Sequence, residues 1–259
     1  MNPAERILHL YDSLVSQQPD FPMVKTWAAV FDIEATSPTL EDEVVECLTA
    51  LRNQLDFTRR LLTERYKVPA ELLEPGFNRF RSVASPAVLQ HPWSGVRGNI
   101  QPPEHRQAFL WGAWVLEQEL EEELSPETMR ELLEELESLR EALRKVELSD
   151  YLREFIQRQV DAISSALRLY MVQGARPMAE AMRKVAGDMV TSKNQLQKEA
   201  ASAPEDARGV LSKAAAFINR TATVCDDLDK IKKAGESAAS IAATVGPLVL
   251  PFVSRMLGH

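Results

Sequence analysis

Apolar residues recur at alternating steps of three and four along most of the chain, and this period limits the fold more than any other feature. One such stripe runs from Val44 to Leu62, and a second runs from Met129 to Val146. This spacing places the members of a stripe on one face of an α-helix. No segment shows the two-residue alternation between turns that is typical of β-strands. We therefore predict an all-α fold.

Capping signals divide these stripes into about eight or nine helices. Asn2 precedes Pro3 and stands three residues before Glu5, which predicts a capping box at the first helix. Ser125 precedes a proline in the same way, and Gly174 suits the left-handed position that ends a helix. The alternating steps predict long, antiparallel helices that pack as in coiled coils and bundles.

Residues 75–103 interrupt the helical pattern. Eight of these 29 residues are proline or glycine, which argues against any helix in the segment. We predict one long irregular loop here, and loops of this length are often functional. After it, a helix is expected from Glu104, with a stripe that includes Phe109 and Ala113 and with Trp111 and Trp114 beside that stripe.

The charges are unevenly distributed along the chain. Residues 1–150 hold 27 acidic and 15 basic residues, whereas residues 151–259 hold 11 acidic and 15 basic residues. We predict an acidic N-terminal helical region over residues 1–147 and a mildly basic C-terminal helical region over residues 148–259. The overall net charge of −8 disfavours nucleic acid as a partner, because binding phosphates requires clustered lysine and arginine.

Motifs that carry chemistry are missing from the sequence. It contains no nucleophile elbow, Walker loop, dinucleotide fingerprint or pair of zinc ligands. We therefore expect no catalytic residues, no cofactor and no metal. The weakest of three functional hypotheses is an enzyme with an unrecognised site in the 75–103 segment, which would involve His91, Trp93, Arg97 and His105.

Two segments are candidates for binding a protein partner. Twelve glutamates lie between Glu117 and Glu147. They form either a solvated helix face or a docking face for a basic partner or for the basic second half of the chain. A tryptophan in the 75–103 segment either fixes that segment to the core or is offered to a partner. The partner-binding candidates are Trp93, Arg97, Glu121, Glu122, Glu134 and Glu135.

The apolar tail, residues 234–258, has two interpretations besides a permanent membrane anchor. Only Glu236 is charged between Lys233 and Arg255, but two prolines and two glycines offset the hydrophobicity that a span needs. The tail either packs inside the bundle, with a break at Gly246–Pro247, or is conditionally exposed and enters a membrane. The membrane-contact candidates are Lys232, Lys233, Ile241, Val245, Leu248, Leu250 and Phe252.

These features favour a non-enzymatic protein-interaction or oligomerisation module. Its expected partner is another protein or a second copy of the chain. The two cysteines, Cys47 and Cys225, lie in helical stripes, as expected for buried small residues in a reducing cytoplasm. The alternative is a membrane-perturbing effector of the toxin or cell-defence type, at the inner face of a membrane, with the tail as its active segment.

Overall fold

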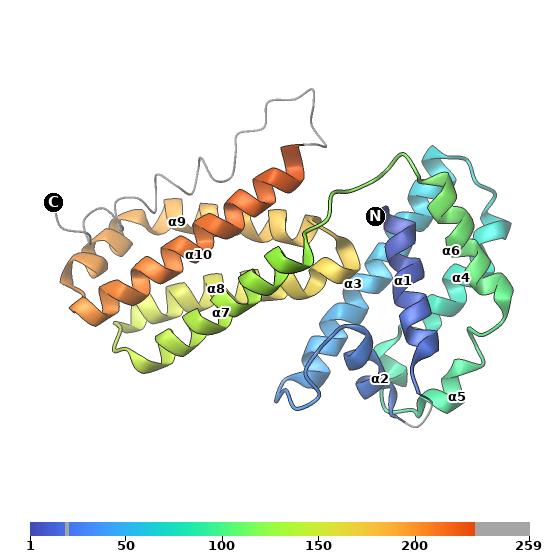
Figure 1. Cartoon of the computed structure of the whole chain (residues 1–259), viewed down its shortest axis with the longest axis horizontal. Coiled ribbons are helices and arrows are strands. Elements are labelled where there is room, and N and C mark those ends of the chain that lie inside the picture. Colours follow the sequence, from blue (N-terminus) through green and yellow to red (C-terminus); the bar gives the residue numbers. More distant parts are fainter. Residues whose placement is uncertain (19–20, 231–259) are drawn as a thin grey trace. The chain divides into compact units, whose positions relative to one another are not determined.

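The structure, a computed structural model, describes residues 1–18 and 21–230. Ten α-helices form over these residues, together with a short π-helical turn and a short 3₁₀ turn (Figure 1). The described residues contain no β-strand, only an isolated bridge between Pro22 and Pro92. The predicted all-α fold is therefore confirmed.

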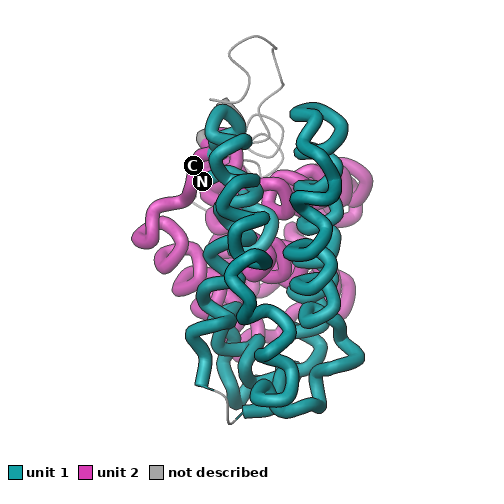
Figure 2. Tube along the Cα trace, turned by 90° about the vertical axis from the view of Figure 1, so that its right-hand side faces the viewer, with its two compact units in different colours: residues 1–121, 171–174 teal, residues 122–170, 175–259 magenta. Residues whose placement is uncertain are grey.

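The chain divides into two compact units (Figure 2). Unit 1 holds residues 1–121 and 171–174, and unit 2 holds residues 122–170 and those from 175 onward. The charge pattern predicts a boundary at residue 147. Because the acidic segment 122–147 belongs to unit 2, the charges are more even than they look in sequence. Unit 1 carries 17 acidic and 11 basic residues, and unit 2 carries 21 acidic and 19 basic residues.

Unit 1 is built from six α-helices around an aromatic core. Tyr11, Phe77, Phe80 and Phe109 form one connected cluster, in which four pairs of rings have centroids 4.9 to 5.6 Å apart. All four side chains are buried. The six helices are α1 (Pro3–Ser16), α2 (Met23–Val30), α3 (Leu40–Arg60), α4 (Ala70–Val83), α5 (Trp93–Arg97) and α6 (Pro103–Val115).

The prediction of one irregular loop over residues 75–103 is wrong. Helix α4 runs through Pro75, and the remainder of the segment holds the 3₁₀ turn Pro86–Val88 and helix α5. Pro75 removes one helical hydrogen bond. The helix persists because Phe77, Phe80 and Val83 bury their side chains in the core of unit 1. Tertiary packing thus outweighs the local preference of proline.

Gly76 lies at a close approach between α4 and α6. A Cβ atom added there would be 2.5 Å from the carbonyl oxygen of His105 and 2.7 Å from the Cβ of Ala108. Only glycine permits this contact between the two helices. The glycine that argued for a loop in the sequence is therefore a packing residue within a helix.

Unit 2 contains four long helices joined by short turns. They are α7 (Pro126–Lys145), α8 (Asp150–Gln173), α9 (Arg176–Ser202) and α10 (Glu205–Lys230), and the last turn of α8 is counted with unit 1. The α7 stripe of Leu132, Leu136, Leu139 and Leu143 is buried at 0 to 3% exposure, as its spacing predicts. All four helices contribute to one apolar core.

An ion-pair cluster joins α10 to α7 within unit 2. Arg220 donates hydrogen bonds to the carboxylates of Glu131 and Glu135. The bond to Glu135, followed by that to Glu131, raises the pKa of the guanidinium. Part of the acidic face of α7 is thus occupied by a basic residue from the second half of the same chain.

Candidate interaction surface on helix α6

Helix α6 exposes apolar side chains over its second half. Its inner face buries His105, Ala108, Phe109, Gly112 and Ala113. Its outer face carries Leu110, Trp111 and Trp114, which are 46%, 48% and 73% exposed. We call these three residues the α6 face. A surface helix normally presents polar residues to solvent, so the α6 face is unusual for a helix at the surface of a unit.

The helix that carries this face is held firmly against its neighbours. Gly112 lets α6 approach two other segments closely, since an added Cβ would lie 3.3 Å from the Cβ of Ala4 and 3.1 Å from Cδ1 of Leu62. Phe109 is fully buried and contacts the rings of Phe77 and Phe80 in the core. The α6 face is therefore displayed on a rigid element, which reduces the entropy lost on binding.

Acidic residues begin three positions after the α6 face ends at Trp114. Glu117 is exposed, and its backbone amide donates to the carbonyl oxygen of Trp114 at 3.3 Å, which continues the helical turn. Glu119 is held by Arg65 at 2.8 Å and accepts a hydrogen bond from Tyr66 at 2.6 Å. This hydrogen bond raises the pKa of the Tyr66 phenol. The α6 face thus combines apolar side chains with an adjoining negative charge.

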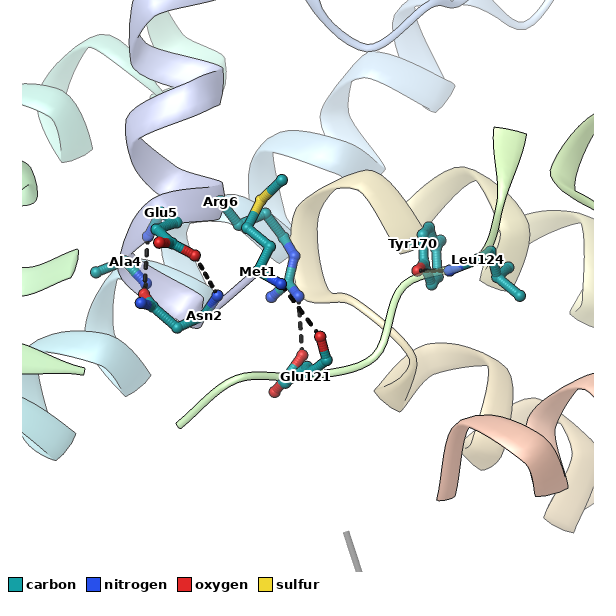
Figure 3. Close-up of polar contacts among 8 residues, drawn as sticks. All are labelled: Met1, Asn2, Ala4, Glu5, Arg6, Glu121, Leu124 and Tyr170. Atoms are coloured by element: carbon teal, nitrogen blue, oxygen red, sulfur yellow. Dashed lines mark hydrogen bonds and ion pairs between the residues drawn. The ribbon is translucent and has the colours of Figure 1, made fainter. Parts of the chain in front are cut away.

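Glu121, one of the predicted partner-binding residues, has a structural role in unit 1 (Figure 3). Its carboxylate pairs with Arg6 at 2.8 Å, and the two side chains are 18% and 7% exposed. Its carbonyl oxygen accepts a hydrogen bond from the amino nitrogen of Met1 at 3.1 Å. The predicted capping box is present beside it, because Asn2 and Glu5 each bond the backbone of the other. The ion pair between Arg6 and Glu121 fixes the segment after α6 to the start of α1.

Gly174 packs directly against this buried pair. It has a φ of +68°, the left-handed conformation that the sequence predicted. A Cβ at this position would be 2.5 Å from Nη2 of Arg6 and 2.5 Å from Oε2 of Glu121. The neighbouring Gln173 donates to the carbonyl oxygen of Ala50 at 3.2 Å. Residues 171–174 are thereby part of the packing of unit 1.

We expect Gly174→Ala to destabilise unit 1. The left-handed conformation alone costs about 1–2 kcal/mol for a residue with a Cβ, and the methyl group must also displace the Arg6–Glu121 pair. Urea unfolding followed by circular dichroism measures the loss. Gly187→Ala in α9 is the matched control: a Cβ there meets nothing within 4 Å, and helix propensity favours alanine by about 0.8–1 kcal/mol. Equal stability of the two variants would contradict this account.

The structure assigns several of the other candidates to intramolecular contacts. Trp93 is fully buried, and its Nε1 donates to the carbonyl oxygen of Gln17 at 3.3 Å. This agrees with the interpretation that it fixes its segment to the core, and not with an offer to a partner. Arg97 donates to the carbonyl oxygen of Val15 at 3.4 Å. In unit 2, Glu135 bonds Arg220, as described above.

Two acidic candidates remain at the surface. Glu122 is exposed. Glu134 is 70% exposed and makes a 3.8 Å ion pair with Arg130 on its own helix, a contact that contributes little to stability in water.

The sequence analysis placed Trp111 and Trp114 beside the stripe of their helix but did not propose them as a site. The signal was present in the sequence, because apolar residues at 109, 110, 111, 113 and 114 exceed what one helix face can bury.

Other kinds of site find no support among the residues that the structure describes. No group of three or more metal-ligating side chains lies together there. None of the helices over residues 1–18 and 21–230 is long and apolar enough to cross a bilayer. The apolar tail and all seven membrane-contact candidates, Lys232, Lys233, Ile241, Val245, Leu248, Leu250 and Phe252, lie outside the described residues.

No protein-family model, curated protein or solved structure matches this chain. The choice among functions therefore depends on the surface chemistry of the two units. Within the described residues, the α6 face brings three exposed large apolar side chains together on one helix.

Proposed function

We propose that the chain is a non-enzymatic protein-interaction module and that it binds its partner through the α6 face. The observation that carries this proposal is the exposure of two tryptophans, Trp111 and Trp114, on one rigid helix. Tryptophan is enriched among the residues that contribute most to binding energy at protein interfaces. Clustered exposed apolar side chains are also a mark of interaction sites in proteins that remain soluble.

The charge beside the α6 face indicates the chemistry of the partner. Glu117 lies three residues after Trp114 and is exposed, whereas Glu119 and Glu121 are paired with Arg65 and Arg6. A partner with an apolar helix flanked by lysine or arginine matches both features. A second copy of this chain matches less well, because a two-fold contact centred on the α6 face would bring the same acidic segments of both copies together.

A probe peptide tests this proposal. We expect an amphipathic helical peptide of leucine and lysine to bind the protein, and a matched peptide of leucine and glutamate not to bind. Replacing both tryptophans, Trp111→Ser with Trp114→Ser, should weaken binding by about 30-fold or more, since a residue at an interface centre contributes about 2 kcal/mol or more. Titration calorimetry measures the affinity. Tryptophan fluorescence reports the contact, because Trp27 and Trp93 are fully buried.

The control is Leu133→Ser, which removes an exposed apolar side chain (47%) from α7 in unit 2. It should leave peptide binding unchanged. Equal binding by the parent and by the double tryptophan variant would contradict the proposed surface. A stable dimer of the parent that becomes a monomer in the double variant would show that a second copy occupies the α6 face instead.

A further inference from the structure

Two arginines join helices α3 and α4 of unit 1 by reciprocal hydrogen bonds. Nη1 of Arg52 donates to the carbonyl oxygen of Arg81 at 3.0 Å, and Nη1 of Arg81 donates to the carbonyl oxygen of Arg52 at 3.2 Å. Each guanidinium is thus fixed to the backbone of the other residue. Two like charges are held together between the helices, and each guanidinium keeps further N–H groups that can donate to a ligand.

A third arginine lies on the same side of α3. Arg59 comes seven residues after Arg52, which is two helical turns, so both side chains leave one face of the helix. Its Nη1 lies 3.5 Å from Oδ1 of Asn78 on α4. The three guanidinium groups therefore follow the line of contact between α3 and α4 over about 10 Å, at 1.5 Å per helical residue. We call Arg52, Arg59 and Arg81 the arginine seam.

One carboxylate balances part of the charge of the arginine seam. Asp56 pairs with Arg81 at 2.9 Å. Within the described part of the chain, Arg52 and Arg59 form no ion pair. Glu74 lies on the same side of α4, about 10 Å from Arg81 along the helix. The seam and Asp56 together carry a net charge of +2, although unit 1 as a whole has 17 acidic and 11 basic residues.

The chemistry of the arginine seam fits a phosphate group. Guanidinium groups are planar and donate pairs of hydrogen bonds that match the oxygens of a phosphate. A phosphorylated side chain carries a charge of about −1.5 to −2 at pH 7, which offsets the surplus charge of the seam. Arg52 and Arg59 are half-buried and the Arg81 side chain is 37% exposed, so a ligand can reach all three. A single carboxylate would leave half of the surplus unbalanced.

We propose that the arginine seam binds a phosphorylated side chain of a partner protein. The phosphate accepts hydrogen bonds from Arg52 and Arg59, and it competes with Asp56 for Arg81. The seam runs along the outside of two helices, so residues that flank the phosphate can contact these helices as well. It shares no residue with the α6 face, and the inference therefore goes beyond the proposed function. Its consequence is a contact that forms only when the partner is phosphorylated.

Binding of a labelled peptide to the full chain tests the arginine seam. The probe is a neutral peptide with one phosphoserine, and its unphosphorylated form is the reference. We expect the phosphopeptide to bind, the reference peptide not to bind, and inorganic phosphate to displace the phosphopeptide only at much higher concentration. Fluorescence anisotropy measures the affinity. Arg52→Gln should weaken binding about tenfold or more, because it removes charge-assisted hydrogen bonds to the phosphate.

Asp56→Asn should have the opposite effect and raise the affinity about fivefold, because no carboxylate then competes with the phosphate for Arg81. Asp12 and Arg106 provide matched controls in the same unit, since they form a one-to-one pair at 2.7 Å. Asp12→Asn and Arg106→Gln change the net charge by the same amounts, but each should alter the affinity by less than about twofold. Asp56→Asn also keeps the test valid if Arg52→Gln does not fold.

Equal weakening by Arg52→Gln and Arg106→Gln would overturn the proposal, because it would show attraction by net charge alone. So would an affinity that Asp56→Asn leaves unchanged, or inorganic phosphate that binds as tightly as the phosphopeptide. Replacing Trp111 and Trp114 with serine should leave phosphopeptide binding intact. A loss of binding in that variant would place the phosphopeptide on the α6 face and overturn the assignment to the seam.

Discussion

Replacing Gly76 with alanine is expected to unfold unit 1 at markedly lower denaturant concentration, with a loss of about 3 kcal/mol. The added methyl group would be 2.5 Å from the carbonyl oxygen of His105. That oxygen belongs to the backbone of α6, so no side-chain rotation can relieve the clash and the two helices must separate. Forcing extra atoms into a well-packed core costs about 1–3 kcal/mol, and a backbone obstacle places this variant at the upper end.

Urea unfolding monitored by circular dichroism measures this loss. The matched control is Gly98→Ala in the same unit, where a Cβ meets nothing within 4 Å and the backbone has an ordinary helical conformation. It should keep the stability of the parent to within about 0.5 kcal/mol. If Gly76→Ala unfolds together with this control, the close approach of α4 and α6 does not exist in solution.

Phe109→Ala is expected to have the other large effect. Its ring lies 4.9 Å from Phe77, 5.5 Å from Tyr11 and 5.6 Å from Phe80, centroid to centroid, and it is fully buried. Removing a buried phenylalanine side chain costs about 3–5 kcal/mol. Since native domains are stable by only about 5–15 kcal/mol, this loss leaves unit 1 close to unfolding. Thermal or urea unfolding checks the change.

Trp111→Ala on the same helix is the control for Phe109→Ala. Trp111 is 48% exposed on the outer face, so its loss should change the stability far less. The two variants should also differ in how they lose affinity for the peptide. Trp111→Ala should lose affinity for the leucine–lysine peptide while it remains folded, and Phe109→Ala should lose affinity only as unit 1 unfolds. A stable Phe109→Ala protein would show that the aromatic core is packed differently.

The two units differ in how they use apolar surface. Unit 1 covers its core with six helices and still leaves two tryptophans of α6 exposed. Unit 2 buries the stripes of its long helices and keeps a small hollow among three of them. The first arrangement fits an external partner.

Local interactions explain why the sequence predicts so many of the helix ends correctly. The capping box of Asn2, the hydrogen bond from the Thr128 amide to Ser125 and the positive φ of Gly174 are all present. Each depends on contacts within about four residues. The α7 stripe is likewise buried as its period requires. These helix ends and the buried stripe of α7 could therefore be predicted from the sequence.

Only the tertiary structure decided the roles of residues 75–103 and of α6. Pro75 and Gly76 favour a loop locally, yet Phe77 and Phe80 bury in the core and hold α4 together. Trp93 lies in a segment rich in proline and glycine, which suggests an exposed loop, but the core of unit 1 encloses its side chain. Trp114 lies in a regular helix, yet its side chain faces solvent. Periodicity determines which residues share a helix face. Which face is covered depends on neighbours distant in sequence, and their positions follow from packing alone.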